Sequence, residues 1–305
     1  MTDMTVKVNG ISFPNPVLTA AGPNVGTCTK LMEAVRGGAG GIVSKTVSPI
    51  PAIDPRPTIR KGPCGGLINC ETWAEIPVEE YFEGYRKVKE SGIPLILSIG
   101  YSPEDMRYLG ALLEKEIQPD AFEFSTHYTG KSIEPLLAVA RALRETVSVP
   151  IWMKISPNTP DIEELAIKAS EFVDAFVAIN SLGPVLDFDP ENPVPPLGSS
   201  FGQGWLSGPT ILPLALRMVY QIASSQPKPV IGVGGVSSGR DAVKFFQAGA
   251  SLVQICTAAI TKGSEIYGKV AGEIDHWLEE RKIPSPDYLR GEYARNIALF
   301  RKERA

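Results

Sequence analysis

The chain has 305 residues with 43% hydrophobic and 21% charged side chains, a composition that predicts a soluble globular protein with a large core. Its net charge of −4 argues against nucleic-acid binding. Because no stretch is long enough to span a membrane and no signal peptide is present, we expect a cytoplasmic location. The four cysteines form no CxxC pair, which argues against a metal or iron–sulfur site and favours reduced thiols.

Strand and helix patterns alternate along the chain. An Asn9-Gly10 turn predicts a hairpin over 5–13 that caps the bottom of the fold. Eight buried strands are predicted at Pro16–Ala21, Gly40–Thr46, Pro94–Ile99, Ala121–Ser125, Ile151–Ile155, Ala175–Asn180, Val230–Val233 and Leu252–Ile255. Helices are predicted between them at Thr29–Arg36, Pro77–Glu90, Pro103–Glu116, Ser132–Thr146, Ile162–Ser170 and Pro209–Ser224, and after an N-cap at Ser238. This alternation predicts one domain over 1–305, an α/β fold with a single (β/α)8 TIM barrel.

Two long segments rich in Pro and Gly, Val47–Ile76 and Ser181–Leu206, interrupt this pattern as βα-loop insertions. Structureless segments of this length in a compact domain are usually functional. The last part, Lys262–Ala305, is predicted to be helical. We expect its apolar side chains to pack on the barrel or on another subunit; they are Tyr288, Tyr293, Ile297 and Phe300.

The chemistry of such a barrel sits at the carboxyl ends of its strands. Gly234-Gly235 and Cys256-Thr257 follow the last two strands, where barrels commonly bind phosphate. Lys45 and Lys154 end two apolar strands, and each needs an anionic or electron-rich partner. A structural ion pair with a neighbouring carboxylate is one interpretation. The other is a phosphorylated cofactor with a reducible ring, and flavin mononucleotide (FMN) fits it.

Several motifs resemble the class 1 dihydroorotate dehydrogenases, a family whose FMN barrel also serves dihydropyrimidine dehydrogenases. The motifs are NGISFPNPVLTAAG, SKT followed by PRP, IWMKISPN, AINS, LSGPTILPLALRMVYQI and VIGVGGVSSGRDAVKFFQAGASLVQICTA. The resemblance implies an FMN barrel that moves a hydride between a saturated ring C–C bond and flavin N5. A side-chain base would handle the second proton.

The resemblance also implies residue roles. Asn180 would bridge the substrate and the lysines, and Ser181 would bind the substrate. The positions that would contact flavin are Ala20, Ala21, Gly22, Lys45, Thr46, Lys154, Asn180, Ser207, Gly208, Gly234, Gly235, Cys256 and Thr257.

The substrate half of the site departs from the family. Where the family has Asn-x-Ser-Cys-Pro-Asn, this chain has Glu123-Phe124-Ser125-Thr126-His127-Tyr128, so Thr stands in place of the base. Asn69 matches an orotate-binding position, but Cys70-Glu71-Thr72-Trp73 follows it instead of a Gly-Leu-Pro-Asn type of loop. If Glu71 and Glu123 point inward, an orotate carboxylate meets two negative charges. Together with Asn69, Ser181 and Tyr128, these two are our substrate-binding candidates.

The acid or base is left open among several side chains. Thr126 holds the position, and His127 has a pKa suited to proton transfer, although a structural role for His127 is also consistent. Lys154 is the third catalytic candidate, and Cys70 and Tyr128 are reserves. Trp73 and Trp205 stack on a planar substrate or only pack the loops.

The favoured function is an FMN-dependent oxidoreductase that acts on a CH–CH bond of a cyclic dihydro or enoyl substrate. The alternatives are a genuine dihydroorotate dehydrogenase of pyrimidine biosynthesis, a non-redox phosphate-binding barrel enzyme, and a flavin carrier or partner subunit. No nicotinamide or iron–sulfur motif is visible, so electrons leave through another chain or a diffusible acceptor. The resemblance implies a homodimer.

Overall fold

The computed structural model describes residues 2–125 and 130–302. Its centre is a parallel barrel whose strand order is β3-β14-β13-β10-β9-β8-β7-β4. The strands are β3 (Val17–Thr19), β4 (Ile42–Val43), β7 (Leu95–Ile99), β8 (Ala121–Ser125), β9 (Ile151–Ile155), β10 (Ala175–Ala178), β13 (Val230–Val233) and β14 (Leu252–Ile255). A parallel bridge between Leu18 and Gly41 closes the ring from β3 to β4. The predicted (β/α)8 barrel is therefore confirmed.

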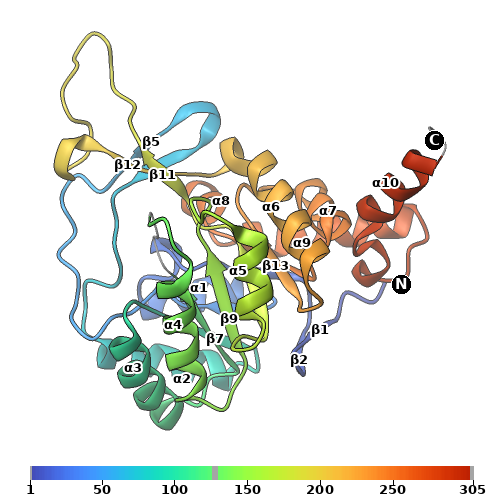
Figure 1. Cartoon of the computed structure of the whole chain (residues 1–305), viewed down its shortest axis with the longest axis horizontal. Coiled ribbons are helices and arrows are strands. Elements are labelled where there is room, and N and C mark those ends of the chain that lie inside the picture. The colour runs from blue at the N-terminus through green and yellow to red at the C-terminus, as the bar shows by residue number, and fades with distance from the viewer. Residues whose placement is uncertain (1, 126–129, 303–305) are drawn as a thin grey trace.

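Helices surround the strands and shield the outer face of the sheet (Figure 1). They are α1 (Cys28–Arg36), α2 (Phe82–Glu90), α3 (Pro103–Glu116), α4 (Glu134–Arg144), α5 (Ile162–Ala169), α6 (Leu212–Ser225), α7 (Gly239–Ala248), α8 (Thr257–Lys262), α9 (Ile266–Glu280) and α10 (Glu292–Lys302). Local chemistry sets several of their starts. Ser102 begins α3 with a capping box, and the predicted cap Ser238 accepts a hydrogen bond from Asp241 N at 3.3 Å.

The N-terminal hairpin closes the bottom of the barrel, as predicted. It pairs β1 (Val6–Val8) with β2 (Ile11–Phe13) in antiparallel register. Asn9 at its turn donates to the carbonyl of Asp174, just before β10, and accepts from the indole N–H of Trp152 at 3.0 Å. Trp152 is fully buried in the barrel interior. The hairpin thus satisfies a polar atom of the core while it covers the amino-terminal ends of the strands.

The two long insertions are not structureless, and that expectation was wrong. They form a second, four-stranded sheet in the order β11-β12-β6-β5, from β5 (Ile59–Lys61), β6 (Leu67–Asn69), β11 (Leu182–Val185) and β12 (Gly204–Ser207). Its central pairing joins Trp205 to Asn69. Strands of three or four residues leave almost no periodic signal. Each insertion forms one antiparallel pair of its own, and the pairing of β6 with β12 joins the two pairs into one sheet.

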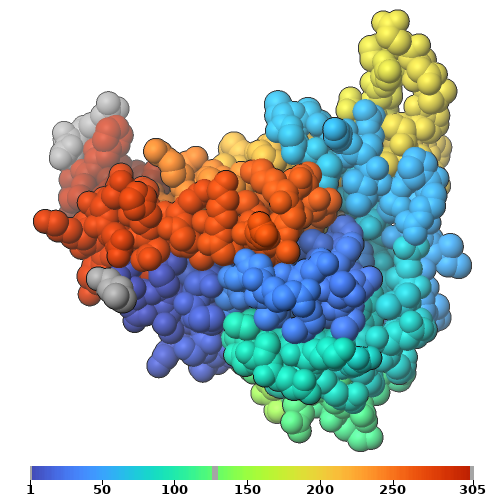
Figure 2. All heavy atoms as spheres, turned by 180° about the vertical axis from the view of Figure 1, so that it is seen from behind, coloured from blue at the N-terminus to red at the C-terminus, as the bar shows by residue number. Residues whose placement is uncertain are grey.

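The second sheet and the C-terminal helix lie at opposite ends of the molecule (Figure 1). The loop between β11 and β12 projects from the body on one side (Figure 2). On the other side, Tyr293 of α10 contacts Tyr220 of α6 edge to face, with ring centroids 5.5 Å apart. The tail therefore packs on the barrel, although Tyr288, Tyr293 and Phe300 each remain more than half exposed.

No helix among residues 2–125 and 130–302 is long and apolar enough to cross a membrane. That residues 1–305 form one domain stays a prediction.

Candidate active site

A cavity of about 280 Å³ lies at the carboxyl ends of the barrel strands, under the second sheet. It contains every position for which the sequence predicted flavin contact, together with three of the predicted substrate positions. These lining residues are Ala20, Ala21, Gly22, Lys45, Thr46, Asn69, Glu71, Lys154, Asn180, Ser181, Ser207, Gly208, Gly234, Gly235, Cys256 and Thr257. The tertiary structure therefore brings together residues as distant in the sequence as Ala20 and Thr257.

Lys154 of β9 lines the cavity and forms an ion pair with Glu123 of β8. Its Nζ lies 3.4 Å from Glu123 Oε1, and the side chains are 5% and 0% exposed. The other oxygen of Glu123 accepts a hydrogen bond of 2.6 Å from Gln254 Nε2. Glu123 is fully buried and does not line the cavity, so the predicted direct contact between Glu123 and the substrate is wrong. Glu123 contacts Lys154 instead. The ion pair is therefore present, and because Lys154 also lines the cavity, its predicted contact with a cofactor stays a prediction.

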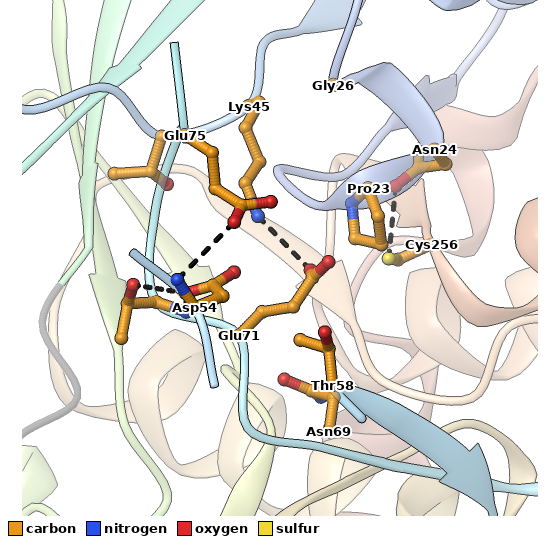
Figure 3. Close-up of polar contacts among 12 residues, drawn as sticks. Pro23, Asn24, Gly26, Lys45, Asp54, Thr58, Asn69, Glu71, Glu75 and Cys256 are labelled. Carbon is orange, nitrogen blue, oxygen red and sulfur yellow. Dashed lines mark hydrogen bonds and ion pairs between the residues drawn. The ribbon is translucent and has the colours of Figure 1, made fainter. Parts of the chain in front are cut away.

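Lys45 is paired from the side of the second sheet. Its Nζ lies 3.1 Å from Glu71 Oε2, and both side chains are largely buried, at 9% and 16% exposed. Figure 3 shows the amine of Lys45 directed at Glu71, which follows β6. Lys45 therefore also has a carboxylate partner, and both groups of the pair line the cavity, so its predicted contact with flavin stays a prediction.

Hydroxyl and amide groups hold a third wall in place. Asn180 follows β10, and its Nδ2 donates to Ser125 Oγ at 2.8 Å. Its carbonyl oxygen accepts from the backbone N–H of Ser181, also at 2.8 Å. Asn180 is therefore held at both ends of its amide and presents a fixed polar edge to the cavity.

The far end of the cavity is built from close backbone packing. Gly234 and Gly235 have φ values of 126° and 88°, which side-chain-bearing residues rarely adopt. A Cβ on Gly235 would lie 2.9 Å from the carbonyl oxygen of Gly208. Nearby, the hydroxyls of Thr257 and Ser207 are 2.9 Å apart. These contacts create a compact turn whose backbone and hydroxyl groups line the cavity, the kinds of group that bind an anion.

Cys256 is a neutral wall residue. Its thiol donates to Asn24 Oδ1 at 3.1 Å (Figure 3). Burial, the largest cause, raises the pKa of the Cys256 thiol to about 11. A nucleophilic or basic thiolate is therefore almost absent near neutral pH.

The remaining acid–base and aromatic candidates are distributed differently. Thr126, His127 and Tyr128 lie outside the described residues. Cys70 and Trp205 line a neighbouring cavity of about 290 Å³ instead, which shares Glu71 with the first. Trp73 lies against Tyr101, with ring centroids 4.4 Å apart, and its indole N–H donates to Ile50 O at 3.4 Å. Trp73 therefore packs the loop, which was one of its two interpretations.

Sequence reasoning missed two residues of this site. Gln254 lines the cavity, and its Oε1 is buried without a partner in the described part of the chain. Its signal was a single polar residue within the apolar strand Leu252–Ile255. Lys262, at the end of α8, lines the cavity near Thr257 and gave no signal apart from its position after the last strand. Over residues 2–125 and 130–302, no cluster of three or more metal-ligand side chains occurs.

Comparison with known proteins assigns this site to a family. The family described as Dihydroorotate dehydrogenase matches residues 126–278. The catalytic subunit of dihydroorotate dehydrogenase B (NAD(+)) from Pyrococcus furiosus is 36% identical, with 94% of this chain and 98% of the relative covered. The corresponding subunits from Methanothermobacter thermautotrophicus and Pyrococcus abyssi are 34% and 35% identical, again with 94% of this chain and with 97% and 98% of the relative covered. The protein therefore belongs to the dihydroorotate dehydrogenase family and is an oxidoreductase.

Proposed function

We propose that this protein is an FMN-dependent oxidoreductase that acts on a CH–CH bond of a cyclic dihydro or enoyl substrate. One observation carries the proposal: every predicted flavin position lines a single cavity, while the substrate side of that cavity carries Glu71 and overlies Glu123. The flavin half therefore retains the family's groups, and the substrate half has been rebuilt.

The residues present fit FMN. The buried, unpartnered Oε1 of Gln254 is an acceptor that suits an N–H group of a polar ring edge. The tight turn at Gly234 and Gly235 offers backbone N–H groups, and Thr257 offers a hydroxyl, for a phosphate. Ala20 and Ala21 supply the small apolar wall that a planar ring needs.

The residues that line the cavity would have different roles in the reaction. Bound FMN supplies the centre that accepts or donates the hydride. Asn69, Asn180 and Ser181 hold the substrate ring by hydrogen bonds, and the fixed amide of Asn180 sets its orientation. We assign the transfer of the second proton, the one that does not move as part of the hydride, to His127 or Thr126, which directly follow β8 in the sequence.

We propose that a partner subunit receives the electrons. The relatives are named as catalytic subunits of an NAD(+)-dependent enzyme. This chain carries no nicotinamide motif of its own. The homodimer and the cytoplasmic location stay predictions.

A genuine dihydroorotate dehydrogenase is the second candidate. The names of relatives that match 94% of the chain favour it. The carboxylate of Glu71 in the cavity speaks against it, because a substrate carboxylate would be repelled there.

The visible absorption spectrum of the purified protein tests the proposal. We expect a flavin spectrum that stays oxidised when dihydroorotate is added without oxygen. Bleaching by dihydroorotate would make the second candidate correct. A colourless protein that FMN does not reconstitute would refute both and favour a non-redox phosphate-binding barrel.

The acid–base assignment has its own test. We expect His127→Ala to slow flavin reduction by the true substrate by roughly 10²–10⁴, the usual contribution of a general acid or base. Thr126→Ala is the matched comparison from the same segment. Unchanged rates in both variants would remove these two residues from the reaction.

A further inference from the structure

We propose that Glu71 is a specificity-determining residue that restricts the site to rings without a carboxylate group. The inference rests on the proposed function and names its substrate class. Glu71 does so by neutralising Lys45, which would otherwise offer a cation to an anionic substrate.

The geometry of the Lys45–Glu71 pair is the first support. The two groups approach to 3.1 Å, and both side chains are more than four-fifths buried. A buried pair is poorly screened by water and salt, so the charge of the amine is largely cancelled where the cavity begins. A substrate carboxylate would have to displace Glu71 from Lys45, and the displaced carboxylate would stay in the same cavity.

The surroundings of Lys45 are acidic, which is the second support. Asp54, 6% exposed, accepts hydrogen bonds from Thr72 through one carboxylate oxygen. The pKa of Glu75 is lowered, mainly by its hydrogen bond with Arg56 and also by the charge of Lys45. Figure 3 shows Asp54, Glu71 and Glu75 grouped around Lys45. Only Lys45 and Glu71 of this group line the cavity, and the group's three carboxylates outnumber its two cations, Lys45 and Arg56, so the local charge is not positive.

The second cavity continues the same character. It adjoins the first at Glu71 and Thr72, which line both. Glu71 is the one charged side chain among its described lining residues. The others are Cys70, Thr72, Tyr101, Pro184, Ser199, Ser200, Gln203, Gly204 and Trp205. This lining of aromatic rings, hydroxyls and one amide suits an uncharged extension of the substrate.

The deeper lysine follows the same rule. Lys154 faces the cavity but is matched by the fully buried Glu123 at 3.4 Å. Both strand-end lysines therefore have a carboxylate of their own, and both carboxylates come from the segments that depart from the family. The buried part of the site selects a neutral ring because its two buried lysines are already paired, whereas Lys262, the third lysine of the lining, is exposed at the end of α8.

Calorimetric titration with orotate tests the inference, because orotate is a uracil ring that carries one carboxylate. The purified protein is compared with Glu71→Gln, which keeps the shape of the side chain and removes its charge. Glu79→Gln is the matched control, since it makes the same charge change at an exposed position outside both cavities. The double variant Lys45→Met/Glu71→Gln asks whether a gain in binding depends on the freed amine.

We expect Glu71→Gln to bind orotate at least about tenfold more tightly than the parent protein, a change of ~1.4 kcal/mol. Glu79→Gln should match the parent, and the double variant should lose the gain. Equal orotate affinity in the parent and Glu71→Gln, including no measurable binding by either, overturns the inference. So does a gain that survives the loss of Lys45.

The two proposals can fail separately. Flavin content, read from the absorption of the same samples, reports on the proposed function, and orotate binding is compared between parent and variant samples of equal flavin content. Should Glu71→Gln fail to fold, Glu71→Ser answers the same question, with uracil titrated alongside. Uracil affinity should change less than orotate affinity, and an equal change in both would overturn the carboxylate argument.

Discussion

The Lys154–Glu123 pair gives a prediction about stability that is independent of the substrate. Its charges are 3.4 Å apart, with side chains 5% and 0% exposed. At an effective dielectric constant of about 20, the attraction is about 5 kcal/mol. Desolvation of two buried charges costs a similar amount, so the pair as a whole contributes little net stability. Removing one partner is different, because the other charge stays buried with only part of its compensation.

We therefore expect Lys154→Met to lower the free energy of unfolding by about 3–5 kcal/mol, because Glu123 would keep only Gln254. The double variant Lys154→Met/Glu123→Gln should recover at least half of that loss. Urea unfolding followed by far-ultraviolet circular dichroism measures both, in protein freed of flavin so that cofactor loss does not contribute. The exposed pair Lys87–Glu83 is the control, and Lys87→Met should leave the unfolding midpoint unchanged.

Two results would refute the reasoning. One is a loss below about 1 kcal/mol in Lys154→Met, the range of exposed pairs. The other is a double variant that is no more stable than the single one, since that would show that the loss comes from packing of the lysine stem rather than from an unpaired carboxylate.

Two further predictions concern other residues that line the cavity. Gly235→Ala should weaken FMN binding and cost about 1–3 kcal/mol of stability, because φ is +88° and the new Cβ would lie 2.9 Å from a backbone oxygen. Equilibrium dialysis measures the FMN affinity, and urea unfolding measures the stability. The control Gly272→Ala lies at an open helical position and should gain up to ~1 kcal/mol instead, and equal FMN affinity in both variants would contradict the prediction. Cys256 should resist alkylation by iodoacetamide at pH 8 and react faster as the pH approaches 11, because with a pKa of about 11 only roughly one thiol in a thousand is ionised at pH 8. Mass spectrometry of each cysteine checks this against the exposed Cys64, and similar rates at pH 8 would show that the pKa of Cys256 is not raised.

The barrel itself could be predicted from the sequence because its signals are local. Buried parallel strands are continuous apolar runs, and capped helices separate them, so the ends of β8, β9 and α3 agree with the predicted residues. Most of the cavity lining could be predicted for the same reason, because its residues follow the carboxyl ends of barrel strands and a closed barrel brings all such ends to one face. That these positions contact flavin came from the family resemblance and stays a prediction.

The second sheet and the charge pairs required the tertiary structure. The strands β6 and β12 are too short to show a period, and each is stabilised by hydrogen bonds to a segment far away in the chain. The partners of Lys45 and Lys154 are 26 and 31 residues away, on other elements. Local sequence records that a buried amine needs a counter-charge, but which carboxylate supplies it depends on how distant segments fold together.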